Sequence, residues 1–245
     1  MKVFSRVLCA MAVMAASVSS AYAGITINGT RVVYPAAQRE VSLSMVNDGK
    51  EARLVQAWVD SGDASERAET SKSPFLITPP MSRVDPGKGQ TLRIMFTGAN
   101  NLPQDRETVF WLNILEIPPK PKAGTDAAEN YMQLAVRSRL KLFYRPKGLQ
   151  GTPDAAVDQV SWRLVSEGKG YAVECTNNTP FNVSFSDVSF KGVAQQEAVS
   201  KGGMCPAMGK DKFPIGGAPD AEGKLVVTVI NDYGGFNPHE MNFTR

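Results

Sequence analysis

The chain has 245 residues, with 27 lysines and arginines against 24 aspartates and glutamates, and only one histidine. This near-neutral balance argues against a nucleic-acid-binding protein, whose basic surface would show in the composition. A single histidine also leaves little material for acid–base catalysis or for a zinc site.

Residues 1–23 have the pattern of a secretory signal peptide. Lys2 and Arg6 precede a short apolar run, and Ala21-Tyr22-Ala23 is a small-x-small cleavage site. The apolar run is too short to span a bilayer, and no second run is long enough. We therefore expect an exported, soluble chain that begins at Gly24 and has no stable membrane insertion.

The first half of the mature chain is predicted to consist of short strands. Apolar and polar residues alternate between turn signals, and no stretch of ten or more residues shows a period of 3.6 residues. The segments concerned are 40–48, 53–60, 75–98 and 109–119. Short strands spaced in this way are typical of β-sandwiches and barrels.

The stretch YMQLAVRSRLKLFYRP, residues 131–146, also alternates like a strand. One side carries Met132, Leu134 and Val136, and four basic residues follow within nine positions. The plain interpretation is a half-buried strand with a solvated basic face. The alternative is an apolar stripe kept for another protein's chain, with the basic residues gripping the end of that chain.

The second half repeats this style. A hairpin is expected through residues 167–170, a turn at 177–180, and an apolar strand within 224–230. Between the halves, the segment RPKGLQGTPDAA contains two prolines and two glycines and is the best boundary candidate. We predict an all-β protein with two β-sandwich domains, residues 24–146 and 147–245.

Two cysteines remain after signal-peptide removal, Cys175 and Cys205. In an oxidising compartment such a pair is expected to form a disulfide, and two separate buried thiols are the alternative. Their spacing excludes a catalytic CxxC pair.

The sequence contains no convincing motif for catalysis or for phosphate binding. His239 and Cys205 could nominally form a nucleophile pair, but a surface histidine and a disulfide cysteine are the simpler interpretation. The segment GGAPDAEGKL fails the phosphate-loop spacing, because Ala218 and Leu225 stand at required positions. We expect no enzyme activity, no cofactor and no soft-metal site; an oxygen-only calcium site stays open, although no loop has the EF-hand pattern.

Several ordered segments together resemble the periplasmic pilus chaperones of the bacterial chaperone–usher pathway. They are TRVVYP, ITPPMSRVDPGKGQTLRI, LPQDRETVFWLNILEIPPK, LKLFYRP, NNTPFNVSF and INDYGG. The resemblance spans nearly the whole mature chain and implies two immunoglobulin-like domains arranged as a boomerang around a cleft. It implies a periplasmic chaperone that uses no ATP, lends an edge strand to incomplete pilus subunits, including an adhesin, and delivers them to an outer-membrane usher.

The resemblance also assigns site residues. The donor strand would carry Met132, Leu134 and Val136. The C-terminal carboxylate of the subunit would be held by Arg31 and Lys141. An interdomain ionic cluster would consist of Glu107, Arg145 and Asp232.

Strict alternation places Lys141 on the face opposite the apolar stripe. The carboxylate grip must therefore come from the cleft side of the strand, or a bulge must intervene between Arg137 and Lys141.

The family divides by the length of the loop before the donor strand and by a cysteine pair in the first domain of its long-loop branch. Residues 117–130 form a modest stretch and the first domain has no cysteine, which favours the short-loop branch. Many short-loop members carry their disulfide nearer the C-terminus than Cys175 and Cys205.

One alternative and one further expectation concern the mature protein as a whole. A two-domain adhesion or binding module would explain the fold, but not the coincidence of the cationic pair with the apolar stripe. An exposed apolar edge strand also predicts that the free protein masks this edge, for example by self-association as a dimer.

Overall fold

A computed structural model describes residues 24–98, 101–120, 132–167, 170–191, 200–215 and 223–245. The predicted signal peptide, the tip of the 167–170 hairpin and most of the loop before residue 132 lie outside this set. None of the helices in these ranges is long and apolar enough to cross a membrane.

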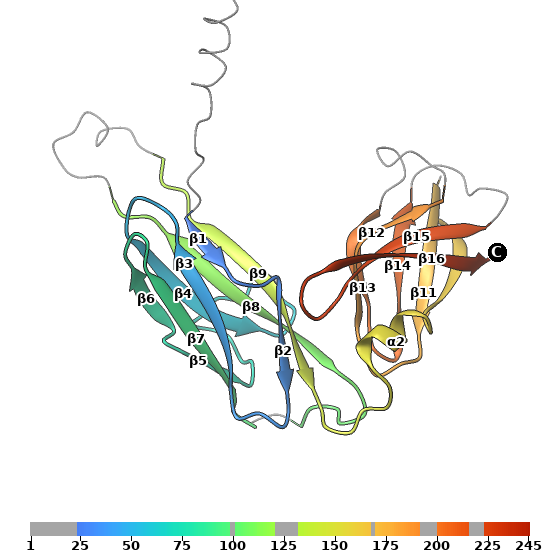
Figure 1. Cartoon of the computed structure of the whole chain (residues 1–245), viewed down its shortest axis with the longest axis horizontal. Coiled ribbons are helices and arrows are strands. Elements are labelled where there is room, and N and C mark those ends of the chain that lie inside the picture. Colours follow the sequence, from blue (N-terminus) through green and yellow to red (C-terminus); the bar gives the residue numbers. More distant parts are fainter. Residues whose placement is uncertain (1–23, 99–100, 121–131, 168–169, 192–199, 216–222) are drawn as a thin grey trace, which may run out of the picture.

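The protein is almost entirely β-structure, arranged as two domains that meet at one end and form a V (Figure 1). The strands of the first domain are β1 Ile25–Ile27, β2 Arg31–Pro35, β3 Val41–Asn47, β4 Arg53–Asp60, β5 Phe75–Thr78, β6 Met81–Val84, β7 Gly89–Phe96, β8 Thr108–Ile117 and β9 Val136–Arg145. The elements of the second are α2 Pro153–Val157, β10 Ser161–Glu167, β11 Gly170–Asn177, β12 Val183–Phe190, β13 Ser200–Cys205, β14 Gly209–Ile215, β15 Lys224–Ile230 and β16 Phe236–Thr244.

The first domain is a sandwich of two sheets, with strand orders β1-β3-β7-β5 and β2-β9-β8-β4-β6. The predicted alternation is confirmed in β3, where Leu43 and Met45 are buried and the serines on either side of Leu43 are exposed. Strand β8 is central in its sheet, because it pairs with β4 on one side and with β9 on the other. The core between the sheets takes its largest buried side chains from both, Tyr34 and Ile94 among them.

The second domain has its own core, inside a sheet of order β13-β12-β15-β16-β10-β11-β14. Strand β16 pairs with β15 along its length but with β10 through only two residue pairs, Trp162↔Phe243 and Arg163↔Thr244. The sheet therefore bends at this weak junction and closes around the core. The predicted hairpin is confirmed by the pairing of β10 with β11, which ends at Glu167↔Gly170.

The short helix α2 was not predicted from the sequence. Thr152 caps it by accepting a hydrogen bond from the Ala155 amide, and Pro153 occupies the first turn, as helix starts prefer. Five residues are too few to show a helical period, which explains the miss.

The linker between the two cores turns through Gly148 and Gly151, whose φ angles of 76° and 86° favour glycine. The first core uses residues up to Tyr144, and Leu149 already packs against the second. The division after Pro146 stays a proposal.

Candidate functional site: the interdomain cleft

The cationic pair lies where the first domain faces the second. Strand β2 pairs in parallel with β9, and this register sets Arg31 directly opposite Lys141. The run VVYP after Arg31 forms the rest of β2, and its alternate residues Val32 and Tyr34 are buried in the first core. The two positive charges are therefore neighbours because of strand register and not of sequence proximity.

Both cations reach across to neutral oxygen atoms of the second domain. Lys141 Nζ donates to Ser184 Oγ at 3.0 Å and to the Gly203 carbonyl at 3.1 Å. Arg31 Nη1 donates to the Ile230 carbonyl at 2.8 Å, while its buried Nε has no hydrogen-bond partner in the described chain. The site thus has unused donor capacity suited to an anion.

The pKa values of the two cations also suit an anion-binding site. Burial, with a further contribution from the Arg31 charge, lowers the pKa of Lys141 to about 8. Burial also lowers the pKa of Arg31, against the opposing effect of the Asp232 carboxylate. A bound carboxylate would compensate both charges.

The apolar stripe is exposed. The side chains of Met132, Leu134 and Val136 are 84%, 69% and 56% exposed. Only Val136 belongs to β9, since the pairing of β9 with β8 ends at Glu116↔Val136. Met132 and Leu134, which the sequence suggested as part of the strand, precede it because no neighbouring strand of the described chain pairs with them.

The register between β8 and β9 runs without a shift from residue 136 to residue 144, so no bulge lies between Arg137 and Lys141. Even-numbered residues of β9, such as Leu140 and Leu142, point into the first core, and Val136 continues their face. Lys141 lies on the other face, toward the second domain. The structure thus places the Lys141 side chain on the cleft side of β9 without a bulge, while its grip on a carboxylate stays a prediction.

The outer edge of β9 is open ahead of the cationic pair. Strand β2 covers this edge only from Lys141 to Arg145. From Val136 to Leu140, no strand among the described residues pairs with it. An added strand could therefore lie along this segment and would have to stop where β2 begins.

The structure also brings Glu107, Arg145 and Asp232 together between the domains. Arg145 Nε donates to Glu107 Oε1 at 2.6 Å, and Arg145 Nη1 donates to Asp232 Oδ2 at 2.8 Å. The second oxygen of Glu107 accepts from the Asn182 amide at 2.9 Å. Burial raises the pKa of Glu107, although Arg145 and Asn182 oppose this shift.

Strand β11 is joined to β13 by a disulfide between Cys175 and Cys205, both fully buried. This confirms the predicted bridge and removes Cys205 as a nucleophile for His239. Among the described residues, no group of three or more histidine, cysteine or carboxylate side chains could hold a metal ion.

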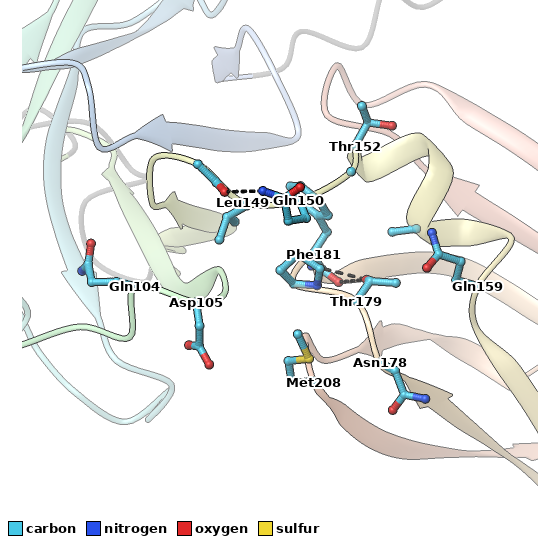
Figure 2. A pocket seen from close by; sticks show the side chains of 14 residues that line it. Gln104, Asp105, Leu149, Gln150, Thr152, Gln159, Asn178, Thr179, Phe181 and Met208 are labelled. Atoms are coloured by element: carbon cyan, nitrogen blue, oxygen red, sulfur yellow. Dashed lines mark hydrogen bonds between the residues drawn. The ribbon is translucent and has the colours of Figure 1, made fainter.

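A separate hollow of about 470 Å³ lies at the hinge (Figure 2). It is bordered by Asp105 of the first domain, by the linker at Gln150, and by Phe181 and Met208 of the second domain. None of the predicted site residues lines it.

Several residues that bond the basic side chains of β9 were not predicted from the sequence. Ser184 and Gly203 meet Lys141 only because the domains fold toward each other. On β4 and β8, Asp60 and Asn113 are completely buried polar side chains that bond the arginines of β9. A charged residue ending an apolar strand, as in VQAWVD, was the available signal for Asp60.

Comparison with known proteins gives this geometry its context. Residues 24–150 match the model of the pili and flagellar-assembly chaperone PapD N-terminal domain, and residues 155–241 match that of the pili assembly chaperone PapD C-terminal domain. The chain belongs to this family of pilus-assembly chaperones. The two family models together cover most of it, in the order in which the two cores occur.

Individual family members are similar over nearly their whole length. The probable fimbrial chaperone YadV of Escherichia coli K12 is 40% identical over 93% of both chains. The chaperone protein FimB/FhaD of Bordetella pertussis is 39% identical over 94% of this chain and 92% of its own. Among solved structures, the SafB chaperone complex with the SafA pilin of Salmonella enterica matches with a TM-score of 0.75 and 28% identity, covering 92% of this chain and 99% of the matched chain.

Proposed function

We propose that this chain is a periplasmic chaperone that binds pilus subunits in its cleft and completes their fold with its own β9 strand. The observation that carries the proposal is the open edge of β9 ending at the cationic pair. Subunits that lack a strand expose a groove and unpaired backbone groups, which is an aggregation hazard. A strand supplied by the chaperone fills the groove and pairs with the free backbone groups.

The register supports one orientation for the bound subunit. A chain lying along Val136–Leu140 with its terminal carboxylate at Arg31 and Lys141 runs in the same direction as β9. The added strand is therefore parallel. Fixing its end also fixes which subunit pockets receive Met132, Leu134 and Val136, because a one-residue slip would turn the other face of β9 into the groove.

The stripe shares its face with the first core. Since Val136 continues the side of Leu140 and Leu142, a subunit that receives the stripe aligns its own core with that of the first domain. The Glu107–Arg145–Asp232 cluster supports this arrangement by holding the second domain at a fixed angle.

The finer parts of the proposal rest on the family. The subunits served include an adhesin, and the loaded complex is delivered without ATP to an outer-membrane usher. The chain acts as a chaperone and not as an enzyme. The short-loop branch remains our assignment, supported by the absence of cysteine from residues 24–146.

Co-expression in the bacterial periplasm with the pilus subunits of the same bacterium tests the proposal. The wild-type chain should protect a subunit from degradation and co-purify with it. Lys141→Ala should abolish co-purification while the variant still folds, and Lys210→Ala, on the exposed side of β14, should behave as wild type. If Lys141→Ala protected subunits as well as wild type does, the carboxylate mechanism would be wrong.

A further inference from the structure

The basic side chains of β9 are only partly solvated, in contrast to the plain interpretation of the sequence, since those of Arg137 and Arg139 are 29% and 23% exposed. Arg137 and Arg139 lie opposite Leu115 and Asn113 of β8, and Asn113 lies opposite Trp58 of β4. Each arginine reaches diagonally to the next row of this three-stranded surface. The two arginines therefore form two steps of one ladder.

The first step is made by Arg137. Its guanidinium lies 4.7 Å from the ring centre of Trp58, and its Nε and Nη2 donate to Asn113 Oδ1 at 2.9 and 2.7 Å. Its Nη1 donates to the carbonyl of Ala64, in the loop after β4, at 2.7 Å. All three nitrogen atoms are thus held, which leaves the side chain one orientation.

The second step is made by Arg139. It lies 4.2 Å from the ring centre of Trp111 and binds both oxygens of Asp60, at 2.6 and 3.0 Å. Asp60 is completely buried and also accepts from Asn113 Nδ2 at 2.8 Å, so Asn113 joins the two steps. Burial acts to raise the pKa of Asp60, but the bonds from Arg139 and Asn113 outweigh it and the pKa is lowered.

The ladder sits where the strand leaves the sheet. Pairing with β8 ends at Val136, and the next residue, Arg137, carries the first step. Met132 projects five residues beyond Arg137, which is roughly 17 Å of extended chain. A tilt of about 10° at Arg137 would therefore move the end of the segment by roughly 3 Å, more than half of the spacing between neighbouring strands.

We propose that the Arg137–Asn113–Asp60–Arg139 ladder is a positioning device that sets the exit direction and register of the donor segment before a subunit binds. This inference rests on the proposed function, because it assigns a purpose to residues that do not touch the subunit groove. A preorganised strand loses less conformational freedom on binding, so the ladder raises the rate and affinity of capture.

A first measurement needs no subunit. Spin labels on Leu134→Cys and Ser42→Cys of the exported chain report the distance between the donor segment and the rigid strand β3, because the native cysteines are bonded to each other. Adding Arg137→Ala should broaden the distance distribution about twofold, since the segment then samples more directions. Arg163→Ala removes an exposed arginine–carboxylate pair from the second domain and should leave the width unchanged.

A second measurement uses the subunit that co-purifies with the wild-type chain. Arg137→Ala should slow its capture during refolding roughly tenfold, Arg137→Lys should fall between, and Arg163→Ala should match wild type. Thermal unfolding of each free variant shows whether stability has changed. A variant that is less stable but has an unchanged distance distribution and capture rate would make the ladder merely structural and overturn the inference. If the wild-type chain captured no subunit, the proposed function would fail, while the distance measurement would still decide on the ladder.

Discussion

Arg31 and Lys141 are paired across the parallel strands β2 and β9, and both side chains donate to neutral oxygen atoms of the second domain. Two adjacent half-buried cations repel each other, and partial burial disfavours the charge of each. A carboxylate placed between them would relieve both costs. The same pair therefore bonds the second domain in the free protein, and under the proposed function it would also bind the terminal carboxylate of a subunit.

The titration of Lys141 should make subunit binding depend on pH. Its pKa of about 8 in the free protein means that the ammonium loses its proton above pH 8. A bound carboxylate favours the charged form and raises this pKa, so binding takes up a proton above pH 8. We expect affinity for a subunit to fall as pH rises above 8, by up to about tenfold per pH unit. Calorimetry in buffers of different ionisation enthalpy measures the proton uptake, and Lys141→Met should abolish it.

The same shift has a consequence for the stability of the free protein. The charged form of Lys141 is disfavoured in the folded state, so the unfolded chain binds more protons between pH 8 and the unfolded value near 10.5. The contribution of Lys141 to the free energy of unfolding should therefore rise with pH across this window. Urea titrations of wild type and Lys141→Met at pH 7.5, 8.5 and 9.5 compare the two slopes. Parallel slopes would contradict the assignment.

The interdomain cluster should show strong coupling. Arg145→Ala leaves the carboxylate of Glu107, only 5% exposed, without its cation, and should cost about 3 kcal/mol. Adding Glu107→Gln should recover part of this loss, because it removes the uncompensated charge. Urea denaturation of the two single variants and the double variant gives the coupling energy. Small-angle scattering of Arg145→Ala should also show a wider range of interdomain angles, and additive losses with an unchanged angle would argue against the cluster as a hinge lock.

The donor stripe should matter for capture and not for folding. Leu134 is 69% exposed, so Leu134→Ser should change the stability of the free chain by less than about 0.5 kcal/mol. It should nonetheless weaken subunit capture at least tenfold, because a polar side chain would enter an apolar groove without a partner. Leu76→Ser, at a 53% exposed position on β5, is the matched control and should leave capture unchanged. Equal capture by all three proteins would show that the segment of residues 132–136 is not the donor.

The disulfide should stabilise the second domain alone. It closes a separation of 30 residues, and its loss should cost about 3 kcal/mol on the chain-entropy account. A Cys175→Ser/Cys205→Ser variant should unfold earlier when followed by the fluorescence of Trp162, which belongs to the second core. For this experiment the tryptophans of the first domain are replaced by phenylalanine, because their fluorescence would otherwise mask that of Trp162. An unchanged unfolding midpoint of the Trp162 signal would contradict the expectation.

Much of the fold could be predicted because its signals are local. The alternation in β3, the apolar run of β15, the turn residues and the two prolines and glycines of the linker each depend on a few adjacent residues. The roles of Arg31, Lys141 and Arg145 came from a resemblance between ordered segments and stay predictions. The structure pairs Arg31 with Lys141 and bonds Arg145 to Glu107 and Asp232. The helix α2 was missed because a single turn leaves no periodic trace.

The sequence by itself determined which residues face which side of each strand, and it therefore predicted an apolar stripe and placed Lys141 on the opposite face. Only the tertiary structure decided what covers that opposite face. The tryptophans and Asp60 that hold the arginines of β9 come from β4 and β8, and Ser184 comes from the second domain. Strand order, register and the angle between domains bring these distant residues together, and those depend on the packing of whole sheets, which no short pattern encodes.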